Sequence, residues 1–206
     1  SVAALKGGVT TVFDMPNTKP ATTTQERLQN KFAIIDGQLA EVGLSLRYKL
    51  FFGADKNQFH EIVKVKADIA GIKVFMGAST GDLLMDDESS LHAVYALAKA
   101  HGLLIALHAE DELIIRNNAA KYADQTDFKY HSIIREPQAA VKAVQLVIEL
   151  AELYQVPSYI LHVSTQGELD LVKAAKARGV MVYIETCPHY LFLDDSQYSN
   201  LNGRGK

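Results

Sequence analysis

The chain has 206 residues, with 21 Lys and Arg against 24 Asp and Glu, and it contains a single Cys. This length predicts one domain, residues 1–206, with enough chain to bury a sizeable core. The nearly balanced charge without a basic block argues against a nucleic-acid partner, and no run of about 18 apolar residues predicts a membrane helix. One Cys excludes an internal disulfide framework, so we expect a cytoplasmic protein.

Short runs of β-branched and aromatic residues alternate with longer amphipathic stretches along the chain. The short runs predict six strands, at residues 9–15, 46–53, 72–76, 103–108, 159–163 and 180–185. The longer stretches predict helices at residues 22–41, 58–67, 86–100, 137–154 and 167–178. Residues 111–136 are the least regular part, where we expect either an excursion beyond the top of the fold or a helix with a loop.

The predicted strands are nearly continuous hydrophobic runs, which is typical of parallel strands covered on both faces. Two α/β architectures fit the repeated strand–helix order: a doubly wound sheet and a TIM (β/α)8 barrel. No GxGxxG motif follows the first strand, which argues against a nucleotide-binding doubly wound sheet. The chain is shorter than the roughly 250 residues typical of a complete TIM barrel.

Functional groups of both architectures gather at the carboxyl ends of the strands. Polar residues at or near the predicted strand ends are Asp14, Asn17, Thr18, Lys73, His108, Glu110, His162, Glu185, Cys187 and His189. Cys187 has no neighbouring base in the sequence, and we expect it to be buried and inert. His189 could contact a substrate or a metal, or it could cap a loop.

Lys73 is unusual because it lies inside an apolar strand, where a charged amine must be paired or neutralised. One interpretation is an edge lysine whose stem is buried and whose ammonium group reaches water. The other is a neutral amine that has been converted to a carbamate, whose two oxygens could bridge two metal ions.

His108 and His162 each follow an apolar run at the end of a predicted strand. A single histidine in such a place can be a satisfied core or rim residue. Two of them on successive strands point to a zinc site, because neutral imidazole binds zinc and the strand ends of a barrel converge. Together with Lys73 they form a candidate ligand set on three neighbouring strands.

Five segments carry a resemblance to a known family: GGVTTVFDMPNTKP (7–20), GIKVFMG (71–77), LHAED (107–111), LHVST (161–165) and ETCPHYL (185–191). They resemble the cyclic-amidase branch of the amidohydrolase superfamily, and within it the class I dihydroorotases. The segments occur in the family's order over nearly the whole chain, and MPNT with its following Pro is the most specific. Dihydropyrimidinases have a Tyr five residues after the metal-bridging lysine, where this chain has Ala78.

The resemblance implies a (β/α)8 barrel with two zinc ions, bridged by carboxylated Lys73. It assigns His108 and His162 to the second metal and Asn17 to the carboxylate side of a small-molecule substrate. The implied reaction is the reversible hydrolysis of the cyclic amide of dihydroorotate to N-carbamoyl-aspartate, in pyrimidine biosynthesis. A homodimer is compatible with the resemblance, and no nucleic-acid or membrane partner is implied.

The chain also departs from the family's pattern. The family's first strand ends in a His-x-His pair that binds the first metal, and its last strand supplies the Asp that shuttles a proton. This chain has neither motif. We therefore expect an internal fragment containing about strands two to seven of the barrel, with the proton-shuttle Asp outside the chain. Such a fragment alone is expected to be inactive and to bind at most one metal weakly.

Two other functions remain open. A non-catalytic dihydroorotase-like scaffold protein would share the fold, although it has no need of Lys73, His108 and His162 together. An allantoinase or a dihydropyrimidinase-type enzyme would use the same kind of site on a different cyclic amide.

Overall fold

The computed structural model describes residues 2–77 and 83–200. Within these residues, six parallel strands form one sheet in which each strand pairs with its neighbours in sequence, in the order β1-β2-β3-β4-β5-β6. They are β1 (Thr11–Asp14), β2 (Arg47–Gly53), β3 (Gly71–Phe75), β4 (Ile105–His108), β5 (Ser158–Ile160) and β6 (Val182–Ile184). The six predicted strands are confirmed, and most of them are shorter than predicted.

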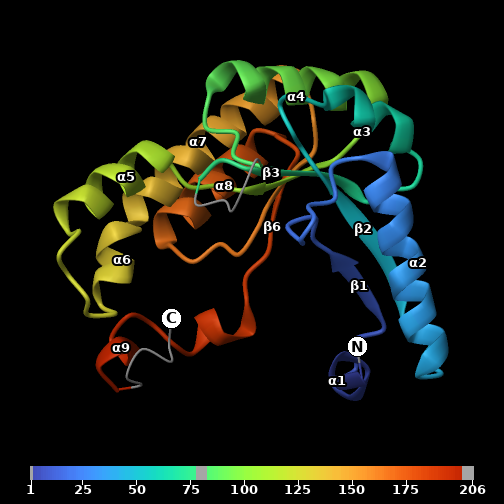
Figure 1. Ribbon diagram of the computed structural model, residues 1–206. Coiled ribbons are helices and arrows are strands. Elements are labelled where there is room, and N and C mark those ends of the chain that lie inside the picture. The colour runs from blue at the N-terminus through green and yellow to red at the C-terminus, as the bar shows by residue number, and fades with distance from the viewer. Residues whose placement is uncertain (1, 78–82, 201–206) are drawn as a thin grey trace.

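The main connecting helices are α2 (Gln25–Glu41), α3 (Phe59–Val65), α4 (Glu88–His101), α7 (Pro137–Tyr154) and α8 (Gln166–Ala177). They lie along the outside of the curved sheet (Figure 1), where α7 packs against both α4 and α8. A doubly wound sheet reverses its strand order and carries helices on both faces. The sequential strand order and the outer helices therefore identify a curled, parallel half-barrel, and the doubly wound alternative is wrong.

Alternate residues of each strand face opposite sides of the sheet. Ile72 and Val74 of β3 belong to the large hydrophobic core between the sheet and the helices. Lys73 lies between them and therefore faces the inner side of the curl. A second, smaller hydrophobic cluster contains Phe51, Ala106 and Leu161. The covered outer face and this inner cluster explain why the strands read as continuous hydrophobic runs.

The ends of the helices follow from the side chains at their caps. Asp87 precedes α4 and accepts a hydrogen bond from the Ser90 amide at 2.8 Å, which satisfies one of the free N–H groups of the first turn. Gly102 ends α4 in the left-handed conformation, at φ 65°. Thr165 and Glu168 form a reciprocal capping box at the start of α8.

Several elements differ from the prediction. Residues 111–136 contain α5 (Glu112–Lys121) and α6 (Tyr130–Ile134), which confirms the alternative of a helix with a loop. Three short elements were not predicted, and they are α1 (Val2–Lys6), the 3₁₀ helix η1 (Pro188–Leu191) and α9 (Gln197–Asn200). They have at most five residues each, too few for a helical repeat of apolar residues to be visible in the sequence.

No helix among the described residues is long and apolar enough to cross a membrane. The sequence difference at Ala78 lies outside the described residues, as does the C-terminal segment 201–206.

Removing the cap of α4 should destabilise the protein. We expect Asp87→Ala to lower the free energy of unfolding by about 1 kcal/mol, because the Ser90 amide loses its acceptor. Asp87→Asn should retain most of the stability, since an amide oxygen also caps. Urea unfolding followed by circular dichroism measures both changes, and equal losses in the two variants would contradict the capping role.

The hydroxyl of Tyr95 joins α4 to β5 through a 2.9 Å hydrogen bond with Ser158, and both residues are fully buried. Burial raises the pKa of Tyr95 well above its usual value near 10. In the unfolded chain this tyrosine ionises at about pH 10, so the folded state binds more protons above that pH and stability falls as pH rises. We expect Tyr95→Phe to cost about 1 kcal/mol at neutral pH. It should also make the alkaline fall in urea-unfolding free energy less steep, and an unchanged slope would contradict this account.

Candidate functional site

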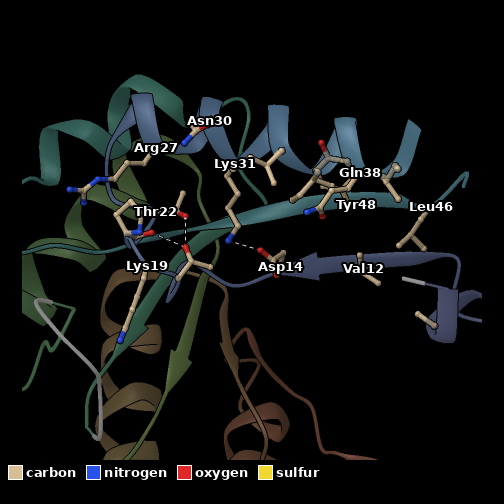
Figure 2. A pocket seen from close by; sticks show the side chains of 16 residues that line it. Val12, Asp14, Lys19, Thr22, Arg27, Asn30, Lys31, Gln38, Leu46 and Tyr48 are labelled. Carbon is tan, nitrogen blue, oxygen red and sulfur yellow. Dashed lines mark hydrogen bonds and ion pairs between the residues drawn. The ribbon is translucent and has the colours of Figure 1, made fainter. Parts of the chain in front are cut away.

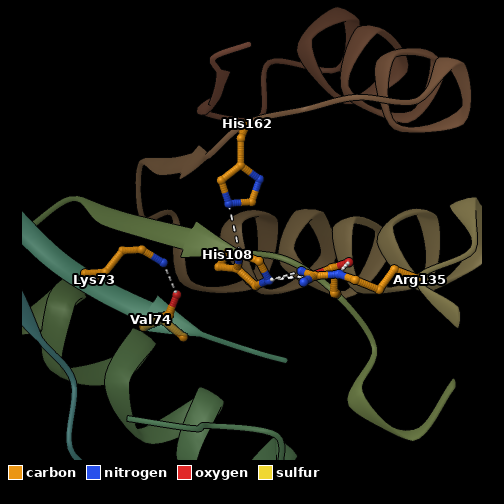
Figure 3. Close-up of polar contacts among 6 residues, drawn as sticks. Lys73, Val74, His108, Arg135 and His162 are labelled. Carbon is orange, nitrogen blue, oxygen red and sulfur yellow. Dashed lines mark hydrogen bonds and ion pairs between the residues drawn. The ribbon is translucent and has the colours of Figure 1, made fainter. Parts of the chain in front are cut away.

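His108 and His162 meet at the carboxyl edge of the sheet. His108 is the last residue of β4, and His162 follows β5 by two residues. Their rings lie edge to face with centroids 4.7 Å apart, and His108 Nδ1 is 2.9 Å from His162 Nε2 (Figure 3). Parallel pairing of Leu107 with Ile160 places these two strand ends side by side. The structure therefore brings together the two histidines that the sequence singled out.

The backbone at His162 explains why β5 is shorter than predicted. His162 has a φ of 44°, in the left-handed region that a residue with a side chain rarely adopts. This turn ends the extended strand at Ile160 and carries the chain toward β6, where the Val163 amide donates to the Glu185 carbonyl. A strained conformation of this kind costs of order 1 kcal/mol, and such residues cluster at functional sites.

The environment of His162 favours the neutral imidazole. Burial lowers its pKa to about 4, and the nearby His108 and Lys73 act in the same direction. His162 is thus uncharged near neutral pH. A neutral imidazole is the form that binds a metal ion.

Lys73 is buried, with only 2% of its surface exposed, so the interpretation of an amine that reaches water is wrong. Its Nζ donates a hydrogen bond to the Val74 carbonyl at 2.7 Å (Figure 3). The same nitrogen lies 3.6 Å from the centre of the Phe75 ring. Burial lowers the pKa of Lys73 well below its usual value, and the charge of Glu185 only partly opposes this. The strand environment therefore favours the neutral amine, which is the form that can become a carbamate.

Glu110 and Arg135 extend the site on the far side of His108. Glu110 Oε2 lies 2.5 Å from His108 Nε2, and Arg135 Nε donates to Glu110 Oε1 at 2.9 Å. Burial would raise the pKa of Glu110, but the hydrogen bonds from His108 and Arg135 outweigh it and lower this pKa to about 2. The carboxylate is therefore ionised and accepts from both neighbours.

Sequence reasoning missed Arg135. It follows α6 in the irregular stretch, and it lies 25 residues along the chain from Glu110. An arginine in a loop carries no local signal, because only tertiary packing, in which α5 contacts both α6 and α7, brings it to the histidine. The adjoining loops are close: a Cβ on Gly77 would lie 2.7 Å from the Glu110 carbonyl oxygen, so this position accepts glycine best.

Three further predicted residues, Asn17, Cys187 and His189, lie in the segments that follow β1 and β6. Asn17 is exposed in the loop after β1, on the same carboxyl edge of the sheet. His189 is exposed, with its ring against Tyr190. Cys187 is partly exposed, so the expectation of a buried thiol is wrong: Cys187 lies in the segment that leads from β6 into η1, outside the core.

Asp14 ends β1 but faces the outer side of the sheet. It forms an ion pair with Lys31 of α2 at 2.5 Å (Figure 2). A cavity of about 460 Å³ lies here between α2 and the first two strands. Its lining contains no histidine, and it includes Val12 and Tyr48 on the outer strand faces. This cavity is separate from the histidine pair.

Within residues 2–77 and 83–200, no group of three or more His, Cys, Asp and Glu side chains is placed to hold a metal ion. His108 and His162 supply two such donors, and unmodified Lys73 is not a donor of this kind. A carbamate on Lys73 would add a carboxylate-like group on the neighbouring strand.

The chain is similar along its length to several curated proteins. It is 31% identical over 206 residues to the multifunctional protein CAD of Squalus acanthias, covering all of this chain and 8% of that protein. It is 28% identical over 214 residues to a dihydroorotase of Methanosarcina acetivorans, covering all of this chain and 44% of the relative. It is 33% identical over 190 residues to an allantoinase of Bacillus velezensis, covering 90% of this chain and 41% of the relative.

Solved structures agree with these sequence matches. The fold superposes on L-hydantoinase (dihydropyrimidinase) from Arthrobacter aurescens with a TM-score of 0.86 and 26% identity, over 97% of this chain and 44% of the other. A D-hydantoinase structure gives a TM-score of 0.80 and 29% identity, over 96% of this chain and 43% of the other. No family model matches the chain.

These relatives are cyclic amidohydrolases, and the chain is a homologue of them over its whole length. The resemblance expected from the five sequence segments is confirmed at this level. The chain spans less than half the length of these curated relatives.

Substitutions at Lys73 test whether this buried position tolerates a permanent positive charge. Lys73→Arg should lower the free energy of unfolding by about 3 kcal/mol or more, because a guanidinium cannot lose its proton and would be a buried charge that Glu185 only partly compensates. Lys73→Met keeps a long side chain without charge and should leave the stability within about 1 kcal/mol of the wild type. Urea unfolding of the metal-free protein measures both, and a tolerated arginine would contradict the burial argument.

Proposed function

We propose that the protein containing this chain is a metal-dependent cyclic-amide hydrolase, and specifically a dihydroorotase that interconverts dihydroorotate and N-carbamoyl-aspartate. The observation that carries the proposal is the facing pair of ring nitrogens, His108 Nδ1 and His162 Nε2, beside the buried amine of Lys73. Relatives named dihydroorotase and CAD support the choice of substrate, as does the MPNT motif at residues 15–18.

The donor set is chemically suited to zinc. His108 and His162 offer two imidazoles at the same edge of the sheet, and the pKa of His162 is low enough to keep its ring neutral. A neutral Lys73 Nζ can add to carbon dioxide and release one proton, which leaves an anionic carbamate with two oxygens. Carboxylated Lys73, His108 and His162 would therefore hold the metal, with carboxylated Lys73 shared between two zinc ions. Zinc bound there would supply a water activated for attack at neutral pH and would polarise the amide carbonyl.

The chain's own residues then have distinct tasks. Lys73 on β3 places its nitrogen on the inner face, where burial lowers its pKa and favours the neutral amine. Asn17 lies in the loop after β1 on the same edge, and its amide can hydrogen-bond the carboxylate side of the substrate. Ring opening adds water across the amide C–N bond and delivers a proton to the leaving nitrogen. The Asp that carries this proton and the His-x-His pair are expected outside residues 1–206.

The proposal also includes the architecture of the domain. Residues 1–206 would form part of one (β/α)8 domain, about strands two to seven, since the six described strands curl in sequential order. The remaining strands would close the barrel and complete the metal site.

Two alternative functions can be compared with this proposal. The allantoinase match and the hydantoinase structures favour a hydrolase of another cyclic amide. A non-catalytic scaffold would keep the fold, but the close placement of two histidines beside a buried lysine argues against it.

The test is an assay of the full-length protein, loaded with zinc, against dihydroorotate, allantoin and dihydrouracil. We expect dihydroorotate to be hydrolysed, and removal of zinc with a chelator to abolish turnover until zinc is returned. Lys73→Ala, His108→Ala and His162→Ala should each lower kcat/KM by more than about 100-fold, since each loses a ligand. Lys129→Ala, at an exposed lysine on the α6 side, is the matched control and should retain activity.

The outcomes separate the alternatives. Turnover of allantoin or dihydrouracil alone would show that the substrate assignment is wrong and the class is right. Absence of turnover with all three substrates would favour the scaffold protein.

A further inference from the structure

The ring of His108 has different partners on its two nitrogens. Nδ1 faces His162, whereas Nε2 lies 2.5 Å from Glu110 Oε2 (Figure 3). Arg135 holds the same carboxylate in a forked contact, with Nε donating to Oε1 at 2.9 Å and the terminal NH2 group donating to Oε2. These three side chains are mostly buried, with exposed fractions of 14% for His108, 13% for Glu110 and 30% for Arg135.

The hydrogen-bonding chemistry selects one tautomer of His108. An ionised carboxylate can only accept, and a guanidinium can only donate. Glu110 therefore requires a proton on His108 Nε2, so Nδ1 is the ring nitrogen that faces His162. Arg135 cannot replace Glu110 in this role, because its NH2 group, 3.3 Å from Nε2, is itself a donor.

We propose that Glu110 and Arg135 are positioning residues, which fix the ring orientation and the Nε2–H tautomer of His108 so that Nδ1 is the atom presented to the metal. This inference rests on the proposed function, because it takes His108 as a zinc ligand. Arg135 acts on His108 through Glu110. Its guanidinium donates to both carboxylate oxygens, so Glu110 keeps a single orientation toward the imidazole.

The location of Arg135 gives the irregular stretch a role at the site. The stretch leaves the sheet after β4, forms α5 and α6, and returns Arg135 to the residue two positions beyond the end of β4. Asn118 of α5 anchors this return by donating to the Ile134 carbonyl and to Glu136. The segment that contains α5 and α6 therefore supports the site through Arg135, which holds Glu110 in place.

Zinc affinity of the full-length protein, measured by competition with a chromophoric chelator, tests the proposal independently of turnover. We expect Glu110→Ala and Arg135→Ala to weaken zinc binding by about 10-fold or more, as is usual for outer partners of a metal-binding histidine. Glu110→Gln keeps an acceptor oxygen without the charge, and Arg135→Lys keeps the charge without the fork. Both should show smaller losses than the alanine variants, and they remain informative if an alanine variant fails to fold.

Arg116→Ala is the matched control. Arg116 of α5 also pairs with two carboxylates, those of Glu112 and Asp86, and its side chain is 59% exposed. Neither of these carboxylates belongs to the contacts of His108 described above. The zinc affinity of Arg116→Ala should equal that of the wild type. A loss in this variant equal to that of Arg135→Ala would overturn the proposal, because any ion pair of the region would then have the same effect.

A double variant distinguishes positioning from general destabilisation. If Glu110 acts through His108, adding Glu110→Ala to His108→Ala should weaken zinc binding by less than about 2-fold further. A full additional loss would overturn the proposal, as would unchanged zinc affinity in folded Glu110→Ala and Arg135→Ala. A wild-type protein that binds no zinc would overturn the proposed function itself, whereas wild-type zinc binding and turnover with unaffected variants would overturn only the positioning roles.

Discussion

Parallel pairing of each strand with its neighbour in sequence is the constraint on which the rest of the structure depends. Successive strands then point the same way, so their carboxyl ends, and the residues that follow them, are collected along one edge. Leu107 beside Ile160 places His108 beside the turn that holds His162. The same pairing sets Lys73 beside Ala106 of β4. Residues separated by 54 positions in sequence thereby come within hydrogen-bonding distance.

The two faces of a strand have different surroundings, as β3 shows. Ile72 and Val74 pack toward the outer helices, in the core that holds the sheet. Lys73, the residue between them, lies on the inner face, where it is 2% exposed. A charged ammonium is costly there, and the low pKa of Lys73 is the direct result. The strand that stabilises the fold is therefore also the element that favours the neutral amine.

The residues of the candidate site differ in how far local structure alone fixes their positions. His108 is placed by β4 itself, and His162 by a strained backbone turn after β5. Glu110 follows β4 closely, but its orientation depends on Arg135, which arrives from the other end of the α5–α6 excursion. The comparisons with cyclic amidohydrolases account for the fold. They leave the substrate open among dihydroorotate and related cyclic amides, because relatives with different names match this chain to similar degrees.

The sequence by itself determined the strand–helix order, the parallel character of the sheet and the candidate residues Lys73, His108 and His162. These follow from local signals, since hydrophobic periodicity and helix caps act over a few residues. Barrel curvature could be expected only from the resemblance, and the structure decided it through the order of pairing. The tertiary structure alone decided that Lys73 is buried, that His162 turns at a positive φ and that Arg135 reaches Glu110. Burial and long-range contacts depend on which elements pack together, and residues far apart in sequence carry no local trace of that packing.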